Sequence, residues 1–139
     1  MTSHTAQAGS RTRLDRFFKI TERGSTVGAE IRGGLVTFFA MAYIVVLNPL
    51  IIGTTPDGTG QLLGGGTDEP NLGMIAAATA LVAGVVTIAM GVFANYPMAL
   101  AAGLGLNAVV AFSIAGLPEV TWADAMGLVV IEGIVILVL

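Results

Sequence analysis

The stretch AAGLGLNAVVAF, residues 101–112, decides how this chain can fold. It lies inside a long apolar segment, yet Gly103, Gly105 and Asn107 fall within five positions of one another. Glycine weakens a helix, and a side-chain amide in hydrocarbon needs hydrogen-bond partners. Two interpretations are open. Either the glycines let another helix pack closely, or the helix is broken here, which is tolerated at membrane depth only where protein buries the backbone or it lines a cavity.

The same letters, GLGLNA at 103–108, also fit a loose G-x-G-x-x-A pattern. A dinucleotide-binding turn with this pattern needs a preceding strand, a soluble crossover unit and an acidic residue about twenty positions later. A position inside an apolar span excludes that interpretation.

Composition indicates that lipid surrounds most of the chain, because 55% of the residues are apolar and only 11% are charged. The sequence has no cysteine, which excludes disulfides and thiolate metal sites, and its single histidine, His4, lies in a polar tail. No Ser/His/Asp set, metal cluster or close carboxylate pair is present in the sequence. We therefore expect no enzyme, no catalytic residue, no metal site and no cofactor.

The charges are unevenly placed. Residues 1–32 hold all six basic residues and three acidic ones, a net charge of +3, whereas residues 33–139 hold six acids and no base, a net charge of −6. A basic segment before the first apolar span predicts a cytoplasmic N-terminus and disfavours a nucleic-acid partner. Within this tail, residues 13–20 fit a short helix on the membrane surface or a helix packed on the rest of the protein. The basic region is too long for a signal peptide.

The first predicted span, 33–52, is twenty residues long, enough to cross a hydrocarbon core of about 30 Å. On an uninterrupted helix Thr37 and Asn48 share one face, which should meet other helices because its polar atoms need partners. Pro49 predicts a kink or an end there. Residues 53–72, rich in Gly, Pro and Thr, predict a flexible outer loop with solvated acids.

Three further spans are predicted, at 73–93, 98–115 and 123–139, with a tight inner turn at Asn95-Tyr96-Pro97 joining the first two of them. Glu132 lies near the middle of the last span, where an ionisable side chain indicates a functional site or a structural hydrogen bond between helices. The sequence stops inside an apolar run, and we expect it to be a fragment truncated at its C-terminus.

The residues RFFKITERGSTVGAEIRGGLVTFFAMAYIVVLNP (16–49) and ANYPMALAAGLGLNAVVAF (94–112) resemble a known family. They are similar to the start of the adenine/guanine/hypoxanthine permease branch (AzgA-like) of the nucleobase–cation symporter-2 (xanthine/uracil permease) family. The family pattern has a basic FFK-ERGT head, a first span with MAYI and NP, and a third span that carries A-P-G-M-G-L-N-A. Two residues depart from the family pattern: Ala102 replaces its usual proline and Leu104 its usual methionine.

The resemblance implies an all-α integral membrane protein of fourteen spans in two inverted seven-span repeats. This chain would supply four spans of the core domain, with the third discontinuous. It implies transport of purine nucleobases by proton symport and alternating access in a plasma or inner membrane. It also implies that Gly105, Asn107 and Gly103 lie at the substrate site. Glu132, Asn48 and Thr37 are the other polar candidates, for a proton-carrying or structural role. The expected partners are the base, a proton, the bilayer and the remaining spans, and a homodimer stays open.

Two alternatives remain. One is an anion or sulfate transporter with the same inverted-repeat fold. The other is a small membrane subunit that does not transport.

Overall fold

The computed structural model describes residues 13–65, 67–96 and 98–139, whose regular secondary structure is helical with no strand among them. They belong to two compact units, Met1–Phe39 and Ala40–Leu139. His4, Gly66 and Pro97, the last of which belongs to the predicted inner turn, lie outside the described residues.

The first unit contains the short helix α1 (Arg13–Phe18) and most of α2 (Val27–Met41). The turn after α1 is closed by Asp15, whose carboxylate accepts from the backbone N–H of Thr21 at 2.8 Å and from its hydroxyl at 2.9 Å. The hydroxyl of Thr26 accepts from Ala29 N–H at 3.2 Å and so caps the start of α2. The helix predicted at 13–20 ends two residues earlier than expected, at Phe18. Helix α2 begins at Val27, six residues before the predicted span at 33–52.

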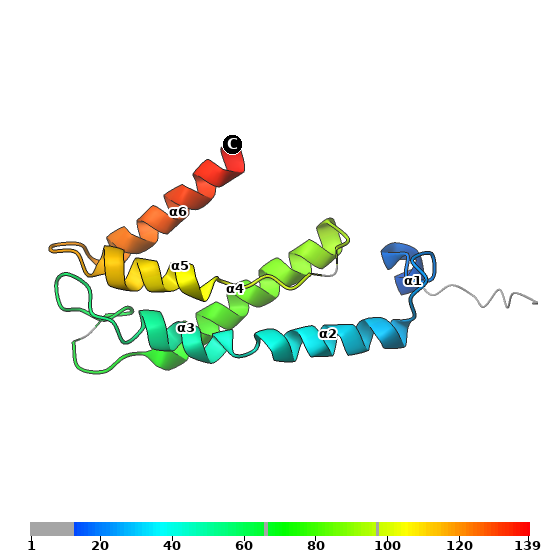
Figure 1. Cartoon of the computed structure of the whole chain (residues 1–139), viewed down its shortest axis with the longest axis horizontal. Helices are drawn as coiled ribbons and strands as arrows, with labels where there is room; N and C mark the ends of the chain where they lie inside the picture. Colours follow the sequence, from blue (N-terminus) through cyan, green and yellow to red (C-terminus); the bar gives the residue numbers. More distant parts are fainter. Residues whose placement is uncertain (1–12, 66, 97) are drawn as a thin grey trace, which may run out of the picture. The chain divides into compact units, whose positions relative to one another are not determined.

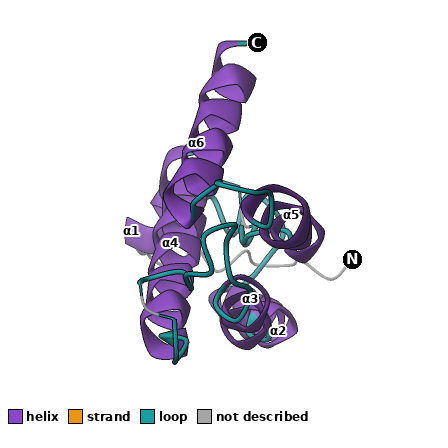
Figure 2. Cartoon of the chain, turned by 90° about the vertical axis from the view of Figure 1, so that its left-hand side faces the viewer, coloured by secondary structure: helices purple, strands orange, loops and turns teal. Residues whose placement is uncertain are grey.

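The second unit contains α3 (Ile44–Ile52), α4 (Leu72–Phe93), α5 (Leu104–Val109), the π-helical turn η1 (Val110–Ala115) and α6 (Trp122–Val138). Figures 1 and 2 show α3 beside α4, with α5 above α3 in both views, and α3 also contacts η1. The start of α6 packs on η1, and α6 then extends away from the other helices (Figure 1).

The core of this unit is concentrated where α3 ends and α4 and α6 begin. Its buried members, drawn from these three helices and η1, are Ile52, Ile75, Val110, Ala111, Ala115, Trp122 and Ala125. Outside this region most large apolar side chains of α4 and α6 are exposed, including Ile88 and Ile131. Exposed apolar helices of this kind are stable in lipid or against further helices, not in water.

Two helical stretches, Val27–Ile52 and Leu72–Phe93, are long and apolar enough to cross a membrane by length and composition, whereas the apolar helix Leu104–Ala115 is shorter. The second stretch agrees with the helix predicted at 73–93. The first is not one uninterrupted helix, because α2 ends at Met41 and α3 begins at Ile44 after a turn. Pro49 lies inside α3, which continues to Ile52, so it does not end the helix.

Candidate functional site

A chain of side-chain hydrogen bonds connects three helices of the second unit. The amide of Asn107 on α5 donates to the side-chain oxygen of Asn48 on α3. Asn48 in turn donates from Nδ2 to the hydroxyl of Thr79 on α4 at 2.9 Å, and Thr79 donates to the backbone carbonyl of Ile75 at 2.8 Å. The fold therefore brings two of the predicted polar residues, Asn48 and Asn107, into direct contact.

Asn48 is the buried centre of this chain, with 5% of its surface exposed, whereas Thr79 and Asn107 are half-buried. A buried amide without partners destabilises the fold, and inside a membrane interhelical hydrogen bonds of this kind hold helices together. Both polar atoms of the Asn48 side chain are hydrogen-bonded, Nδ2 to Thr79 and Oδ1 to Asn107. This pairing leaves part of Asn107 accessible from outside the unit.

The segment before α5 is not helical. Residues 98–103 carry no helix, and Gly103 has the extended dihedrals φ −73° and ψ 117° at the start of α5. Thr87 on α4 holds the middle of this segment: its hydroxyl accepts from Leu100 N–H at 3.0 Å and donates to Leu100 C=O at 3.2 Å. The backbone is thus extended up to Gly103 and helical from Leu104 onward.

The two glycines of this stretch border open space. A Cβ atom added at Gly103 or at Gly105 would meet no heavy atom within 4 Å. Close packing against another helix of the described chain is therefore not the reason for these glycines. Their open side and the accessible part of Asn107 belong to the same turn of backbone, since the backbone N–H of Asn107 donates to the carbonyl of Gly103 at 3.1 Å.

The other two polar candidates lie elsewhere. The hydroxyl of Thr37 donates to Gly33 C=O in its own helix at 2.9 Å. Its predicted common face with Asn48 assumed an uninterrupted helix, and the turn at residues 42–43 removes that basis. Glu132 is exposed on α6. Among the described residues, no three His, Asp or Glu side chains gather as metal ligands would.

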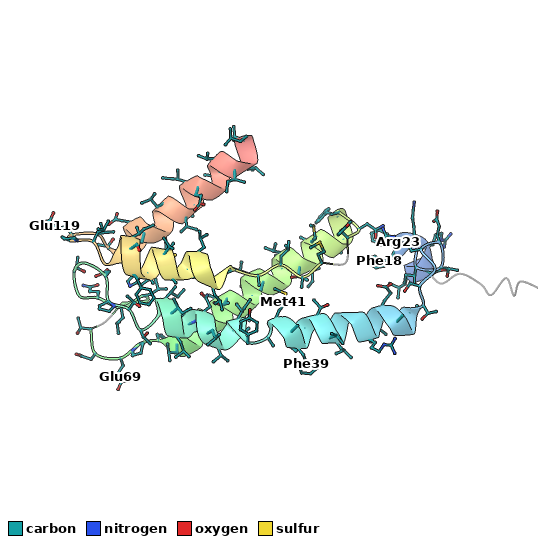
Figure 3. The ribbon with its side chains drawn as sticks, viewed as in Figure 1. Phe18, Arg23, Phe39, Met41, Glu69 and Glu119 are labelled. Atoms are coloured by element: carbon teal, nitrogen blue, oxygen red, sulfur yellow. The ribbon has the colours of Figure 1, made fainter. Side chains whose placement is uncertain are left out.

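An acid that the sequence assigned to a flexible, solvated loop is in fact buried. Asp57 accepts through Oδ1 from Thr59 N–H at 2.9 Å, Thr59 hydroxyl at 2.7 Å and Gln61 N–H at 3.0 Å, and through Oδ2 from Trp122 N–H at 3.0 Å. The hydroxyl of Thr59, followed by the backbone donors, lowers the pKa of Asp57 from 3.8 to about 2 despite its burial. Glu69 and Glu119, in contrast, project outward from their loops (Figure 3).

Asp57 is the centre of a wider contact between two connections, the one after α3 (residues 53–71) and the one before α6 (residues 116–121). The indole Nε1 of Trp122 donates to Thr55 C=O at 3.1 Å, and Gly58 N–H donates to Ala115 C=O at 2.8 Å and Val120 C=O at 3.0 Å. A Cβ on Gly58 would lie 1.9 Å from the carbonyl oxygen of Leu117, so only glycine fits. Hydrogen bonds therefore join the described parts of these two connections.

A local pattern also accounts for Asp124 at the start of α6. Its carboxylate accepts from the backbone N–H of Thr121 at 3.0 Å, while the Thr121 hydroxyl accepts from Asp124 N–H at 3.2 Å. This capping box begins α6 at Trp122. The T-x-x-D spacing at 121–124 is the signal that predicts it.

Comparison with known proteins gives a consistent result. The sequence model of the family described as the Permease family matches residues 28–139. The chain is 40% identical over 114 residues to the adenine permease AdeQ of Escherichia coli (strain K12), covering 82% of this chain and 23% of that protein. It is 35% identical over 139 residues to the guanine/hypoxanthine permease GhxP of Escherichia coli O157:H7, covering 100% of this chain and 28% of that protein.

A third relative, the guanine/hypoxanthine permease PbuO of Bacillus subtilis (strain 168), is 35% identical over 124 residues, covering 88% of this chain and 26% of that protein. No solved structure matches the chain. The chain thus spans about a quarter of the length of the curated relatives it matches.

Proposed function

We propose that this chain, which belongs to the Permease family, is part of a transporter that carries purine nucleobases across a membrane. The names of its relatives, adenine and guanine/hypoxanthine permeases, support this substrate class and a transporter rather than an enzyme. The observation that carries the proposal is the Asn107–Asn48 pair beside the open side of Gly103 and Gly105. An amide and exposed glycine backbone can bind a flat heterocycle with polar edges, and the surrounding apolar helices need no such surface for packing.

The same turn supplies the proposed substrate site. Gly103 and Gly105 let the base approach the backbone, and Asn107 hydrogen-bonds its edge. The interrupted backbone at 98–103 supports a site near the middle of the membrane, since non-helical backbone is stable there only against protein or a cavity. The other half of the site would come from the second repeat of a longer protein.

The proposed topology has four crossings and a cytoplasmic N-terminus. The crossings are α2 with α3, α4, the extended segment with α5 and η1, and α6. The basic residues before Gly33 favour the cytoplasmic side for the N-terminus, and the plasma or inner membrane follows from uptake of external bases. Together these spans would form part of the core domain in a fold of two inverted seven-span repeats.

Transport is proposed to occur by alternating access, with the core domain moving against a gate domain and a proton carried in symport. Glu132, an acid on an exposed face of an apolar helix, is the candidate for proton carriage or for pairing with a span outside this chain. A homodimer is compatible with the exposed apolar faces of α4 and α6.

Uptake of labelled hypoxanthine, adenine and guanine by cells lacking their own purine transporters, and expressing the full-length protein that contains this chain, tests the proposal. We expect saturable uptake that unlabelled purines reduce and that Asn107→Ala abolishes at unchanged surface expression. Thr54→Val, which changes an exposed residue outside the site, serves as the control. Absence of competable uptake for all three bases, or transport of sulfate in their place, would reject the purine assignment.

A further inference from the structure

The hydrogen-bond chain behind Asn107 has a fixed direction. It ends at the backbone carbonyl of Ile75, which can only accept. Thr79 has a single hydroxyl proton, and because it gives that proton to Ile75 it can only accept from Asn48. Asn48 must therefore turn its NH₂ toward Thr79 and its oxygen toward Asn107.

The orientation of the last side chain follows from the others. With the oxygen of Asn48 facing it, Asn107 must offer its NH₂, as observed. The reversed amide of Asn107 would bring two acceptor oxygens together and lose a hydrogen bond. The side-chain oxygen of Asn107 thus has no bond to another described residue and is left on the half-buried side of the group.

We propose that Asn48 and Thr79 are positioning residues that hold the side-chain oxygen of Asn107 toward the substrate, so that the site selects bases presenting an N–H donor. This rests on the proposed function, because it assumes that Asn107 contacts the transported base. It adds a rule for selectivity: replacing the N–H that meets Asn107 by N–CH₃ removes the matched hydrogen bond and introduces a clash.

Removal of the Thr79 hydroxyl should reverse the chain. In Thr79→Val the NH₂ of Asn48 would be buried without an acceptor, whereas the reversed amide leaves only a carbonyl oxygen unbonded, which is tolerated more often. Reversal makes Asn48 donate to the oxygen of Asn107 and turns the Asn107 NH₂ to the substrate. If the competent orientation falls to roughly a tenth of the molecules, the apparent affinity for the base falls about tenfold.

The experiment compares Thr79→Val, Thr79→Ser and Thr54→Val in the full-length transporter. Thr54 is a matched control, because its hydroxyl also donates to the carbonyl four residues earlier, Leu50 C=O, but no side chain donates to it among the described residues. KM and kcat for hypoxanthine are measured, together with competition by hypoxanthines methylated at each single N–H.

We expect Thr79→Val to raise KM for hypoxanthine about tenfold with little change in kcat, and to reduce the penalty for methylation at one N–H by a similar factor. Thr79→Ser and Thr54→Val should keep the wild-type pattern. A wild-type KM and methylation pattern in Thr79→Val would overturn the proposal. Absence of purine uptake by the wild-type protein would instead reject the proposed function.

If Thr79→Val does not reach the cell surface, Thr79→Ala removes the same hydroxyl with a smaller side chain and replaces it in the comparison. Loss of surface expression in both variants, but not in Thr79→Ser, would show a hydroxyl that only joins α4 to α3 and would overturn the orienting role.

Discussion

The side-chain oxygen of Asn48 accepts a hydrogen bond from the side-chain amide of Asn107, fifty-nine residues later in the sequence. This bond joins the buried face of α3 to the first turns of α5 and brings the Asn-Pro pair of the first apolar segment to the GLGLNA stretch. Two of the three motifs that carry the family resemblance are therefore in direct contact.

Replacement of Asn48 by leucine should weaken the fold. The variant keeps the branched shape of the side chain but removes its hydrogen bonds to Asn107 and Thr79, each contributing about 0.5–1.5 kcal/mol. Thermal unfolding of the purified transporter in detergent measures the change, with Thr54→Val as control. An unfolding temperature equal to that of the wild type would contradict the structural importance of the bond.

Gly105 and Gly58 should respond in opposite ways to added side chains. Gly105→Val places atoms in open space, so surface expression should persist while uptake falls by about tenfold or more if the base binds there. Gly58→Ala forces a Cβ against the Leu117 carbonyl and should lower surface expression itself. Surface labelling and uptake separate the two effects; normal uptake in Gly105→Val would place the base elsewhere.

Thr87→Val should release the extended segment before α5. The variant removes both hydrogen bonds to Leu100, each contributing about 0.5–1.5 kcal/mol. Hydrogen exchange at the Leu100 amide should therefore be faster than in the wild type, whereas exchange in the first turn of α6 should not change. Unchanged exchange at Leu100 would show that other contacts hold the segment.

Asp57 should make the contact between the connections after α3 and before α6 sensitive to acid. Because its pKa is about 2 in the folded protein and 3.8 in the reference state, its ionisation stabilises the fold above pH 3.8, and this contribution is lost as the pH falls toward 2. In Asp57→Asn the unfolding temperature at neutral pH should be lower, and the decrease between pH 4 and 2 smaller. An identical pH dependence in both proteins would contradict the assignment.

Helix positions followed from the sequence where apolar runs have clear boundaries. The predicted helix at 73–93 differs from α4 by one residue at its start, where Asn71 caps the helix by accepting from Met74 N–H at 3.2 Å. The turn at residues 42–43 was not predicted, because the segment is continuously apolar and its only breaker, Pro49, lies inside α3.

Contacts over long sequence distances were harder to predict. Asp57 lies in a stretch of Gly, Thr and Pro that reads as a flexible loop, and its partner Trp122 is sixty-five residues away. The local pattern Asp57-Gly58-Thr59 does favour a turn closed by the aspartate, which was a usable signal. At the site, Asn48 and Asn107 were both selected because they are amides in apolar spans, but Thr79, a common residue in such helices, was not.

The extended segment at 98–103 has a consequence for how the protein is made. Leu100 is bonded to Thr87, but Ala99, Ala101 and Ala102 form no hydrogen bond within the described part of the chain. Such backbone groups are each costly by several kcal/mol in hydrocarbon. During biosynthesis this segment should consequently stay in water or against protein, and it should enter its final position only when other atoms can pair with it. Segment 98–103 would then enter the membrane later than its position in the order of synthesis implies.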